Sequence, residues 1–421
     1  MNDERLARLR HTTGMRLAME ESATLAAIEG DFAGNPQGMG YFYDLFRQGR
    51  SLLAGAEPLV GTTCIQVPEE LIYAVGARPL RLCSGASAHE QVGAELLPAK
   101  ACPLVKATCG RLALLAPEER QRLALVAVPT TCDQKRKTGE LLAADGWPVH
   151  SLAVPPASDT EEAHAYWYAS IGRLLQRLEE ATGNRASVRS LQAAIAKVEA
   201  ARGAFRRLHA LAEARPPVLL GKDALLVASA YQAGDINRWT RAVHELCTEL
   251  EARVRAGQTA CSERAPRLLL AGSPPLFPNL KVPLLLEKAG AVLVGDEACS
   301  SCRLLYDRLA FDEAARYDLL PAVADRYLKP CACPCLTPDG NRLRRLTAQA
   351  QRLAADGVVY LTFAGCHLFA MEQGTVGSTF AGLGLPMLAI ETDFSPEDTG
   401  QLSTRVEAFI ESIRARKRRR A

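Results

Sequence analysis

The segments PLVGTTC (58–64), PEELIYAVGA (68–77) and RPLRLC (78–83) decide the fold, because they predict a strand, a helix and a second strand in succession. The first and third are short apolar runs, and a proline such as that at residue 68 is typical of a first helical turn. The runs LALVAVPTTC (123–132) and PVHSLAVP (148–155) continue the alternation around a further helix. Strands that alternate with helices indicate parallel βαβ units.

The same alternation returns in the C-terminal half, after a helical region. Residues 160–262 contain three stretches with apolar residues at helical spacing. Four strand-like runs then follow: RLLLAGSPP (267–275), AVLVGDEAC (291–299), GVVYLTFAGC (357–366) and LPMLAIETDF (385–394). We therefore expect an α/β protein with two parallel-sheet domains joined by helices.

The expected organisation has four parts. Residues 1–58 form a helical N-terminal segment with a glycine-rich interruption at 34–40. The first α/β domain spans 59–158, the helical region spans 159–264, and the second α/β domain with a C-terminal helix spans 265–421.

The composition is that of an ordinary globular protein, with 48% apolar and 23% charged residues among 421. No apolar run approaches the ~18 residues of a membrane span, and the first residues, MNDERLARLRHTTGM, lack the apolar core of a secretory signal. We therefore expect a cytoplasmic protein that neither spans nor binds a membrane.

The net charge of +3 depends on the tail Arg414–Arg420, which holds six basic residues, so the rest of the chain carries 3 − 6 = −3. The body is therefore not expected to bind nucleic acid. The tail is interpreted as a solvated helix end, with contact to an acidic partner as the alternative.

The thirteen cysteines require an explanation, because a reducing compartment disfavours structural disulfides. Five of them stand at or just past the end of a strand-like run: Cys64, Cys83, Cys132, Cys299 and Cys366. Ligands of open α/β sheets bind outside the carboxyl ends of the strands. These thiols could therefore converge on one cleft between the two domains.

Local chemistry favours the thiolate form that binds metals. Cys64 precedes a predicted helix, and Cys102 is followed directly by a proline that begins another. Amide groups at a helix N-terminus favour a thiolate. The nearby Lys106, Lys135 and Lys137 would act in the same direction.

Spacing alone leaves three interpretations of the cysteines. Structural zinc prefers paired CxxC motifs, and only Cys299–Cys302 has that form. The run Cys331-Ala-Cys333-Pro-Cys335 resembles neither a zinc finger nor a ferredoxin motif. An iron–sulfur cluster assembled by the tertiary fold, a zinc or thiol-redox site, and inert buried thiols such as Cys247 all remain open.

Other motifs carry little functional information. The chain has no P-loop motif, no dinucleotide-binding glycine motif after a strand and no nucleophile elbow. AGSPP (271–275) is a weak candidate for a phosphate-facing strand end. His367 is a candidate proton donor or a structural histidine, and Glu69 and Glu70 suit the first turn of a helix.

Several segments in a fixed order resemble the superfamily of 2-hydroxyacyl-CoA dehydratases and benzoyl-CoA reductases. The segments are GTTCIQVPEELIYAVGARPLRLC (61–83), LPAKACPLVK (97–106), VPTTCDQKRK (128–137), RLLLAGSPP (267–275), LLLEKAGAVLVGDEACSSCR (284–303), DGVVYLTFAGCHLFAMEQ (356–373) and LGLPMLAIETDFSPEDTGQLSTRVEAFIE (383–411). The resemblance implies two Rossmann-like domains, a helical part and an oxygen-sensitive iron–sulfur cluster in the interdomain cleft. It also implies electron delivery by a separate ATP-hydrolysing iron–sulfur activator protein.

Within the superfamily, the chain looks most like the single-subunit double-cubane proteins. The cysteines on motif positions are Cys64, Cys102, Cys132, Cys299, Cys335 and Cys366. Six ligands would serve two bridged cubanes, an [8Fe-9S] cluster, whereas a dehydratase subunit needs three for one [4Fe-4S] cubane. Cys333 fits as well as Cys335, and Cys109 and Cys302 are further candidates.

Some positions depart from the family pattern and leave the ligand set open. Ala107 stands where relatives usually have serine, and Cys331 is an additional cysteine. Some double-cubane relatives carry a cysteine near Pro117, which Cys109 would replace.

The resemblance implies an anaerobic oxidoreductase, a homodimer that reduces a small molecule at a double-cubane cluster. One alternative is a lyase, the subunit of a dehydratase that removes water from a 2-hydroxyacyl-CoA by a ketyl-radical route. The others are a non-catalytic electron or cluster carrier, and a two-domain binding protein with inert cysteines.

Overall fold

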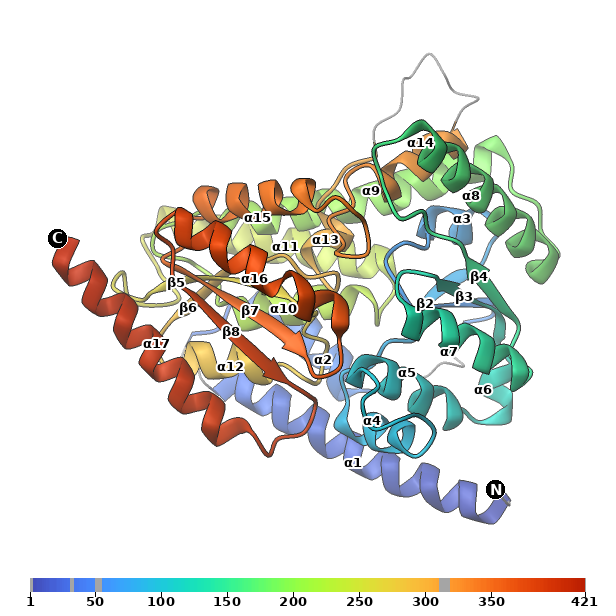
Figure 1. Cartoon of the computed structure of the whole chain (residues 1–421), viewed down its shortest axis with the longest axis horizontal. Helices are drawn as coiled ribbons and strands as arrows, with labels where there is room; N and C mark the ends of the chain where they lie inside the picture. The colour runs from blue at the N-terminus through green and yellow to red at the C-terminus, as the bar shows by residue number, and fades with distance from the viewer. Residues whose placement is uncertain (1–2, 31–33, 50–54, 310–318, 421) are drawn as a thin grey trace.

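The computed structural model describes residues 3–30, 34–49, 55–309 and 319–420 and contains two parallel sheets, each of four strands. The first sheet is built from β1 (Leu59–Thr62), β2 (Arg78–Arg81), β3 (Leu123–Pro129) and β4 (Val149–Leu152). The second is built from β5 (Arg267–Gly272), β6 (Val292–Asp296), β7 (Gly357–Phe363) and β8 (Met387–Thr392). The predicted α/β class with two Rossmann-like parallel-sheet domains is confirmed (Figure 1).

The two sheets share one topology. Their strand orders are β2-β1-β3-β4 and β6-β5-β7-β8. In each sheet the chain first adds a strand on one side and then returns to the other side. The direction therefore reverses between β1 and β3 and between β5 and β7, where open α/β sheets bind ligands at the carboxyl ends of the strands.

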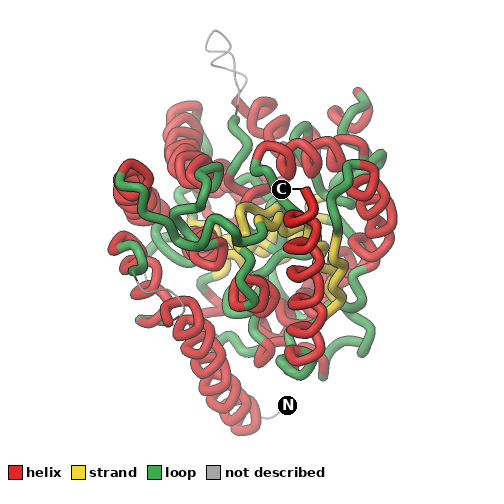
Figure 2. Tube along the Cα trace, turned by 90° about the vertical axis from the view of Figure 1, so that its left-hand side faces the viewer, coloured by secondary structure: helices red, strands yellow, loops and turns green. Residues whose placement is uncertain are grey.

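Helices enclose both sheets, so the central strands are apolar on both faces. Every residue of β7 is buried, as is all of β3 except Ala124. Buried parallel strands characteristically lack polar–apolar alternation. Figure 2 shows the strands in the interior with helices around them.

The covering helices follow their strands in the sequence. Those of the first half are α3 (Glu69–Ala74), α4 (Ser87–Ala94), α5 (Pro103–Ala113), α6 (Pro117–Gln121) and α7 (Asp133–Ala144). Those of the second half are α12 (Lys281–Lys288), α13 (Cys302–Leu305), α14 (Leu319–Leu328), α15 (Gly340–Arg352), α16 (His367–Gly382) and α17 (Thr399–Arg420).

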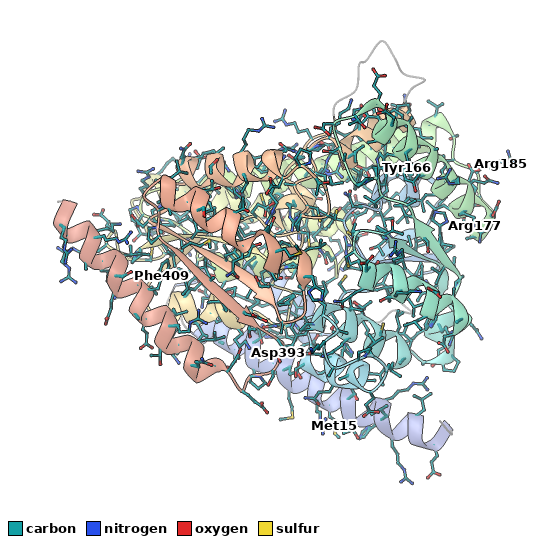
Figure 3. The ribbon with its side chains drawn as sticks, viewed as in Figure 1. Met15, Tyr166, Arg177, Arg185, Asp393 and Phe409 are labelled. Atoms are coloured by element: carbon teal, nitrogen blue, oxygen red, sulfur yellow. The ribbon has the colours of Figure 1, made fainter. Side chains whose placement is uncertain are left out.

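The part of the chain between β4 and β5 forms four helices: α8 (Glu161–Thr182), α9 (Val188–Leu211), α10 (Gly221–Tyr231) and α11 (Ile236–Arg255). The sequence predicts three of them and misses α10, because α10 is buried on most of its surface and has no polar face. Exposed side chains such as Tyr166 and Arg177 project from α8 at the edge of the molecule (Figure 3).

The N-terminal segment is helical and connects the two halves. It contains α1 (Asp3–Gly30), a short 3₁₀ turn (Gln37–Met39) within the glycine-rich interruption, and α2 (Gly40–Arg47). Arg10 donates hydrogen bonds to the Leu114 and Leu115 carbonyls at 3.0 and 2.7 Å, and Thr24 donates to the Pro278 carbonyl at 2.9 Å. Helix α1 therefore contacts both α/β halves (Figure 1).

A segment of the C-terminal half packs against the core of the first sheet. Val323 and Tyr327 of α14 belong to the same buried cluster as Val60 of β1. The Trp167 indole of α8 donates a hydrogen bond to the Ala324 carbonyl at 2.8 Å. This packing brings the loop that contains Cys331, Cys333 and Cys335 toward the first sheet.

The domain boundaries at residues 58, 158 and 264 stay predictions.

Among the described helices, none is both long and apolar enough to cross a membrane.

Candidate metal centre

Cysteines follow the carboxyl ends of strands in both sheets. Cys64, Cys83 and Cys132 come just after β1, β2 and β3, and Cys299 and Cys366 come just after β6 and β7. Strands β1, β3 and β7 flank the positions where the strand order reverses, so Cys64, Cys132 and Cys366 stand at the expected crevices, whereas β2 and β6 are edge strands.

The amine of Lys135, in the first turn of α7, lies among these thiols. Its Nζ donates a hydrogen bond to the Thr63 carbonyl at 2.9 Å. Burial by itself would lower the pKa of Lys135, but the nearby Cys64, Cys83, Cys132 and Cys299 outweigh burial and raise it. Burial raises the pKa of Cys132 and Cys299, that of Cys299 to about 11, and the charge of Lys135 opposes this effect at both thiols.

Two pairs of thiols are joined directly. A hydrogen bond between Cys102 and Cys366 lowers the pKa of Cys366 against the opposing effect of burial. In the same way, a hydrogen bond from Cys335 lowers the pKa of Cys333, although burial opposes this shift. In each pair, one thiol is therefore the more readily ionised: Cys366 in the first pair and Cys333 in the second.

Nine of the thirteen cysteines interact with one another or with Lys135, and they divide into two neighbouring groups. The first group contains Cys102, Cys132 and Cys366. Cys83 is assigned to it because Cys83, like Cys132, interacts with Lys135. The second consists of Cys64, Cys299, Cys331, Cys333 and Cys335. An electrostatic interaction between Cys333 and Cys366 links them. Thiols from both sheets therefore meet in one region.

Arg303 supplies a second buried cation to this region. It is 5% exposed, and its guanidinium donates to the Ala332 carbonyl at 3.0 Å. Burial alone would lower the pKa of Arg303, but Glu297, Cys299 and Cys333 raise it. Arg342 also donates to the Ala332 carbonyl, at 2.8 Å, so two arginines fix the Cys331–Cys335 loop.

Gln134 connects the loops of the two halves beside the first group. Its Oε1 accepts a hydrogen bond from the Cys102 backbone N–H at 2.7 Å, and its Nε2 donates to the Gly365 carbonyl at 2.9 Å. Gly365 has a φ of 77°, and a Cβ there would lie 2.4 Å from the Lys100 carbonyl oxygen. Only glycine allows this close approach of the two loops.

Four cysteines lie apart from the nine. Burial raises the pKa of Cys109 to about 11, and its other interaction is a hydrogen bond with Thr138. Cys247 is fully buried in α11, and Cys261 follows that helix. Cys302 faces Asp296, Glu297 and Asp307, and these carboxylates reinforce the effect of burial in raising its pKa. Such surroundings disfavour a ligating thiolate at Cys302.

Of the three lysines that the sequence places near the thiols, only Lys135 reaches them. Lys106 donates to the Ala99 carbonyl at 2.8 Å, and Lys137 pairs with Glu140 on the surface. Their side chains leave α5 and α7 on other faces of those helices.

The other sequence candidates have separate surroundings. His367 is exposed at the start of α16. Glu69 accepts a hydrogen bond from Tyr231 at 2.5 Å, and Glu70 pairs with Arg202 at 2.7 Å. Both carboxylates are buried structural partners in this arrangement.

Sequence reasoning left out Cys331, although it borders the other cysteines of its run. Its Sγ accepts a hydrogen bond from Gln66 Nε2 at 2.9 Å, and burial raises its pKa to about 12. Arg303 and Gln134 carried no recognisable signal, because their contacts join residues far apart in the chain.

The donor set fits an iron–sulfur cluster. Within the described residues, no three cysteine, histidine or acidic side chains close around a single metal ion. The thiols interact with two buried cations, Lys135 and Arg303. Thiolates are the usual protein ligands of iron–sulfur clusters, so the side chains present fit such a group.

Comparison with known proteins identifies relatives over most of the chain. Residues 64–413 match the family model described as 2-hydroxyglutaryl-CoA dehydratase, D-component. YjiM of Escherichia coli (strain K12), provisionally named a dehydratase subunit, is 34% identical over 85% of this chain and 91% of its own length.

Two more distant relatives have names that state a substrate. The (R)-phenyllactyl-CoA dehydratase beta subunit of Clostridium sporogenes is 22% identical over 84% of this chain and 91% of its own length. The (R)-2-hydroxyglutaryl-CoA dehydratase subunit beta of Acidaminococcus fermentans is 22% identical over 86% of this chain and 93% of its own. The superfamily resemblance seen in the sequence is thereby confirmed.

Proposed function

Because the chain belongs to the 2-hydroxyglutaryl-CoA dehydratase D-component family, we propose that it is the iron–sulfur subunit of a lyase that removes water from a 2-hydroxyacyl-CoA. The observation that supports this proposal is the gathering of nine thiols from both halves of the chain, six of which interact directly with Lys135 or Arg303. A structural role would not require cysteines at five strand ends beside two buried cations.

The proposed ligands are the six cysteines on family motif positions: Cys64, Cys102, Cys132, Cys299, Cys335 and Cys366. Cys333 is the alternative to Cys335, because these two thiols share one hydrogen bond. When bound, the cluster would supply single electrons at low potential. Lys135 and Arg303 would offset the negative charge of the thiolates, and the packed strand ends would exclude water.

The electrons are proposed to come from a separate ATP-hydrolysing activator protein, since the chain lacks the P-loop motif. The relatives named as beta subunits support a second, different subunit as a further partner. The thirteen free thiols are in keeping with the reducing cytoplasm.

One observation supports a second candidate, a homodimeric reductase with a double-cubane cluster. The nine gathered thiols exceed the three that one cubane in a dehydratase subunit needs. Their division into two groups would allow one cubane beside Cys132 and another beside Cys64. This candidate would pass electrons to a small molecule without a second type of subunit.

The iron content of protein purified under strict anaerobiosis tests both candidates. We expect about four iron and four sulfide per chain for the dehydratase subunit and about eight iron for the double-cubane form. Native mass measurement adds a second criterion, because the dehydratase requires a different partner subunit and the reductase forms a homodimer. Protein that stays colourless and iron-free after anaerobic reconstitution would exclude both.

A further inference from the structure

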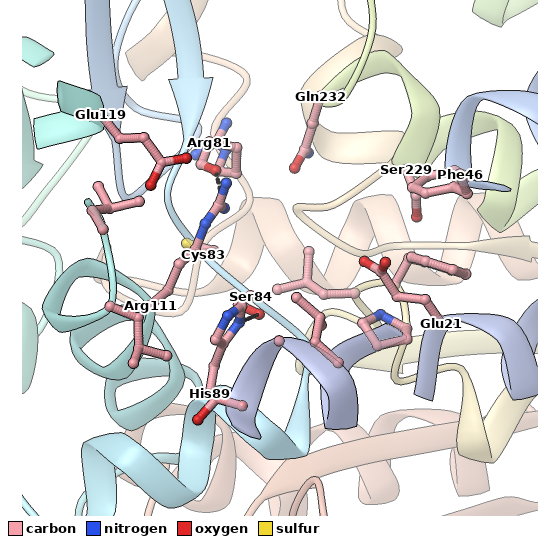
Figure 4. A pocket seen from close by; sticks show the side chains of 18 of the residues that line it. Glu21, Phe46, Arg81, Cys83, Ser84, His89, Arg111, Glu119, Ser229 and Gln232 are labelled. Carbon is pink, nitrogen blue, oxygen red and sulfur yellow. Dashed lines mark hydrogen bonds between the residues drawn. The ribbon is translucent and has the colours of Figure 1, made fainter. Parts of the chain in front are cut away.

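A cavity of about 360 Å³ lies beside the thiols, between α1 and the end of β2. Cys83 and Ser84 line one wall, and Ser300, the residue after Cys299, lines another. Figure 4 shows side chains from α1, α5 and the segment after β2 facing this space. A molecule bound here would border the proposed cluster region.

Arg81, the last residue of β2, is the buried cation of this cavity. It is 8% exposed. Among the described residues, no acceptor lies within hydrogen-bond distance of its guanidinium and no carboxylate lies within ion-pair distance. Arg81 lowers the pKa of the buried Glu69 against the larger effect of burial. A guanidinium carries five N–H donors. The Arg81 nitrogens are not among the sealed polar atoms that lack a partner, so they open onto the cavity, where a ligand can accept from them.

A second arginine is held next to Arg81. Arg111 of α5 donates from Nη1 to the Arg81 carbonyl oxygen at 2.8 Å (Figure 4). Arg10 of α1 also lines the cavity. Two carboxylates share the lining, Glu21 and Glu119, and Glu119 accepts a hydrogen bond from the Ala116 backbone N–H at 2.9 Å.

The lining therefore favours an anion. Three arginines against two carboxylates leave 3 − 2 = +1 with His89 neutral. The uncompensated donors are those of Arg81, which face the cavity close to Cys83. A planar guanidinium matches the two oxygens of a carboxylate in a bidentate pair.

We infer that Arg81 binds the carboxylate of a small substrate in this cavity. This inference rests on the proposed function, because it places the substrate next to the cluster. The volume is near the lower end of ligand pockets and suits a small acid or the acyl part of a thioester. The carboxylate would come from a free 2-hydroxy acid or from the far end of a dicarboxylic acyl-CoA.

Calorimetric titration of the anaerobically purified protein tests the inference. The probes are lactate, 2-hydroxyglutarate and 2-hydroxyglutaryl-CoA. Their counterparts are lactamide and an acyl-CoA whose acyl part has no free carboxylate. We expect at least one carboxylate probe to bind the unmodified protein about tenfold or more tightly than its counterpart. Arg81→Gln should remove this preference, and Arg81→Lys should retain part of it, because lysine keeps the charge but not the planar fork.

Arg177→Gln is the matched control, since Arg177 is exposed on α8 and pairs with Glu180 at the surface (Figure 3). It should bind the probes as the unmodified protein does. If only lactate or 2-hydroxyglutarate binds, the carboxylate that Arg81 recognises belongs to a free acid. If only 2-hydroxyglutaryl-CoA binds, it belongs to the acyl part of a thioester.

Equal binding of the carboxylate probes and of their counterparts without a carboxylate by the unmodified protein would overturn the inference, as would an unchanged preference in Arg81→Gln. Iron content is measured on the same samples. An iron-loaded protein without carboxylate preference rejects the Arg81 site alone, whereas an iron-free protein rejects the proposed function.

Discussion

Replacement of Cys132 or Cys366 by alanine is expected to reduce the iron content of the anaerobically purified protein by about half or more. Cys132 follows β3 and Cys366 follows β7, so the two proposed ligands belong to different sheets. A cluster that bridges both halves cannot be retained when either half loses its ligand. Iron and sulfide analysis, together with the visible absorption of the cluster, measures the effect.

Cys247→Ala is the control for these variants. Cys247 is fully buried in α11 and lies apart from the nine thiols, and it packs as a small apolar side chain. Its replacement should lower the free energy of unfolding by about 1 kcal/mol and leave the iron content unchanged. If Cys132→Ala and Cys366→Ala retained as much iron as Cys247→Ala, these two cysteines would not be ligands.

Lys135→Met is expected to shift the reduction potential of the cluster to more negative values, by on the order of 100 mV. The buried amine of Lys135 interacts with Cys64, Cys83, Cys132 and Cys299. Removing its positive charge makes the addition of an electron less favourable. Methionine keeps a similar length and volume, so the packing around α7 is disturbed little. Redox titration followed by EPR spectroscopy gives the potential.

Lys137→Met tests the same substitution on the same helix. Lys137 is exposed and pairs with Glu140, with both side chains 68% exposed. Water and salt screen such a charge, so this variant should leave the potential within about 20 mV of the unmodified protein. Equal potentials for Lys135→Met and Lys137→Met would show that Lys135 does not influence the cluster.

The fold could be predicted from the sequence because its signals are local. Apolar runs marked the strands, and the cysteines directly after them marked the carboxyl ends of the sheets. Helix α10 was missed because a helix buried on most sides has no amphipathic pattern. The packing of α14 on the first sheet was missed because it depends on contacts such as Trp167 to Ala324.

The candidate site was predicted in outline but not in its details. Sequence proximity suggested that three lysines act on the thiols, yet only Lys135 is directed toward them, since the direction of a side chain depends on the helix face. Arg303 and Arg81 could not have been found in the same way. Their roles come from burial beside residues that the fold brings together.

The central claim is that thiolates from both sheets hold one iron–sulfur centre. Diffraction at the iron absorption edge, from crystals grown without oxygen, tests it most directly. The account predicts strong anomalous peaks between Cys132 and Cys366 or between Cys64 and Cys299, within bonding distance of their sulfur atoms. A crystal structure of reconstituted protein with no iron peak in this region, and with each sulfur packed only against apolar side chains, would contradict it.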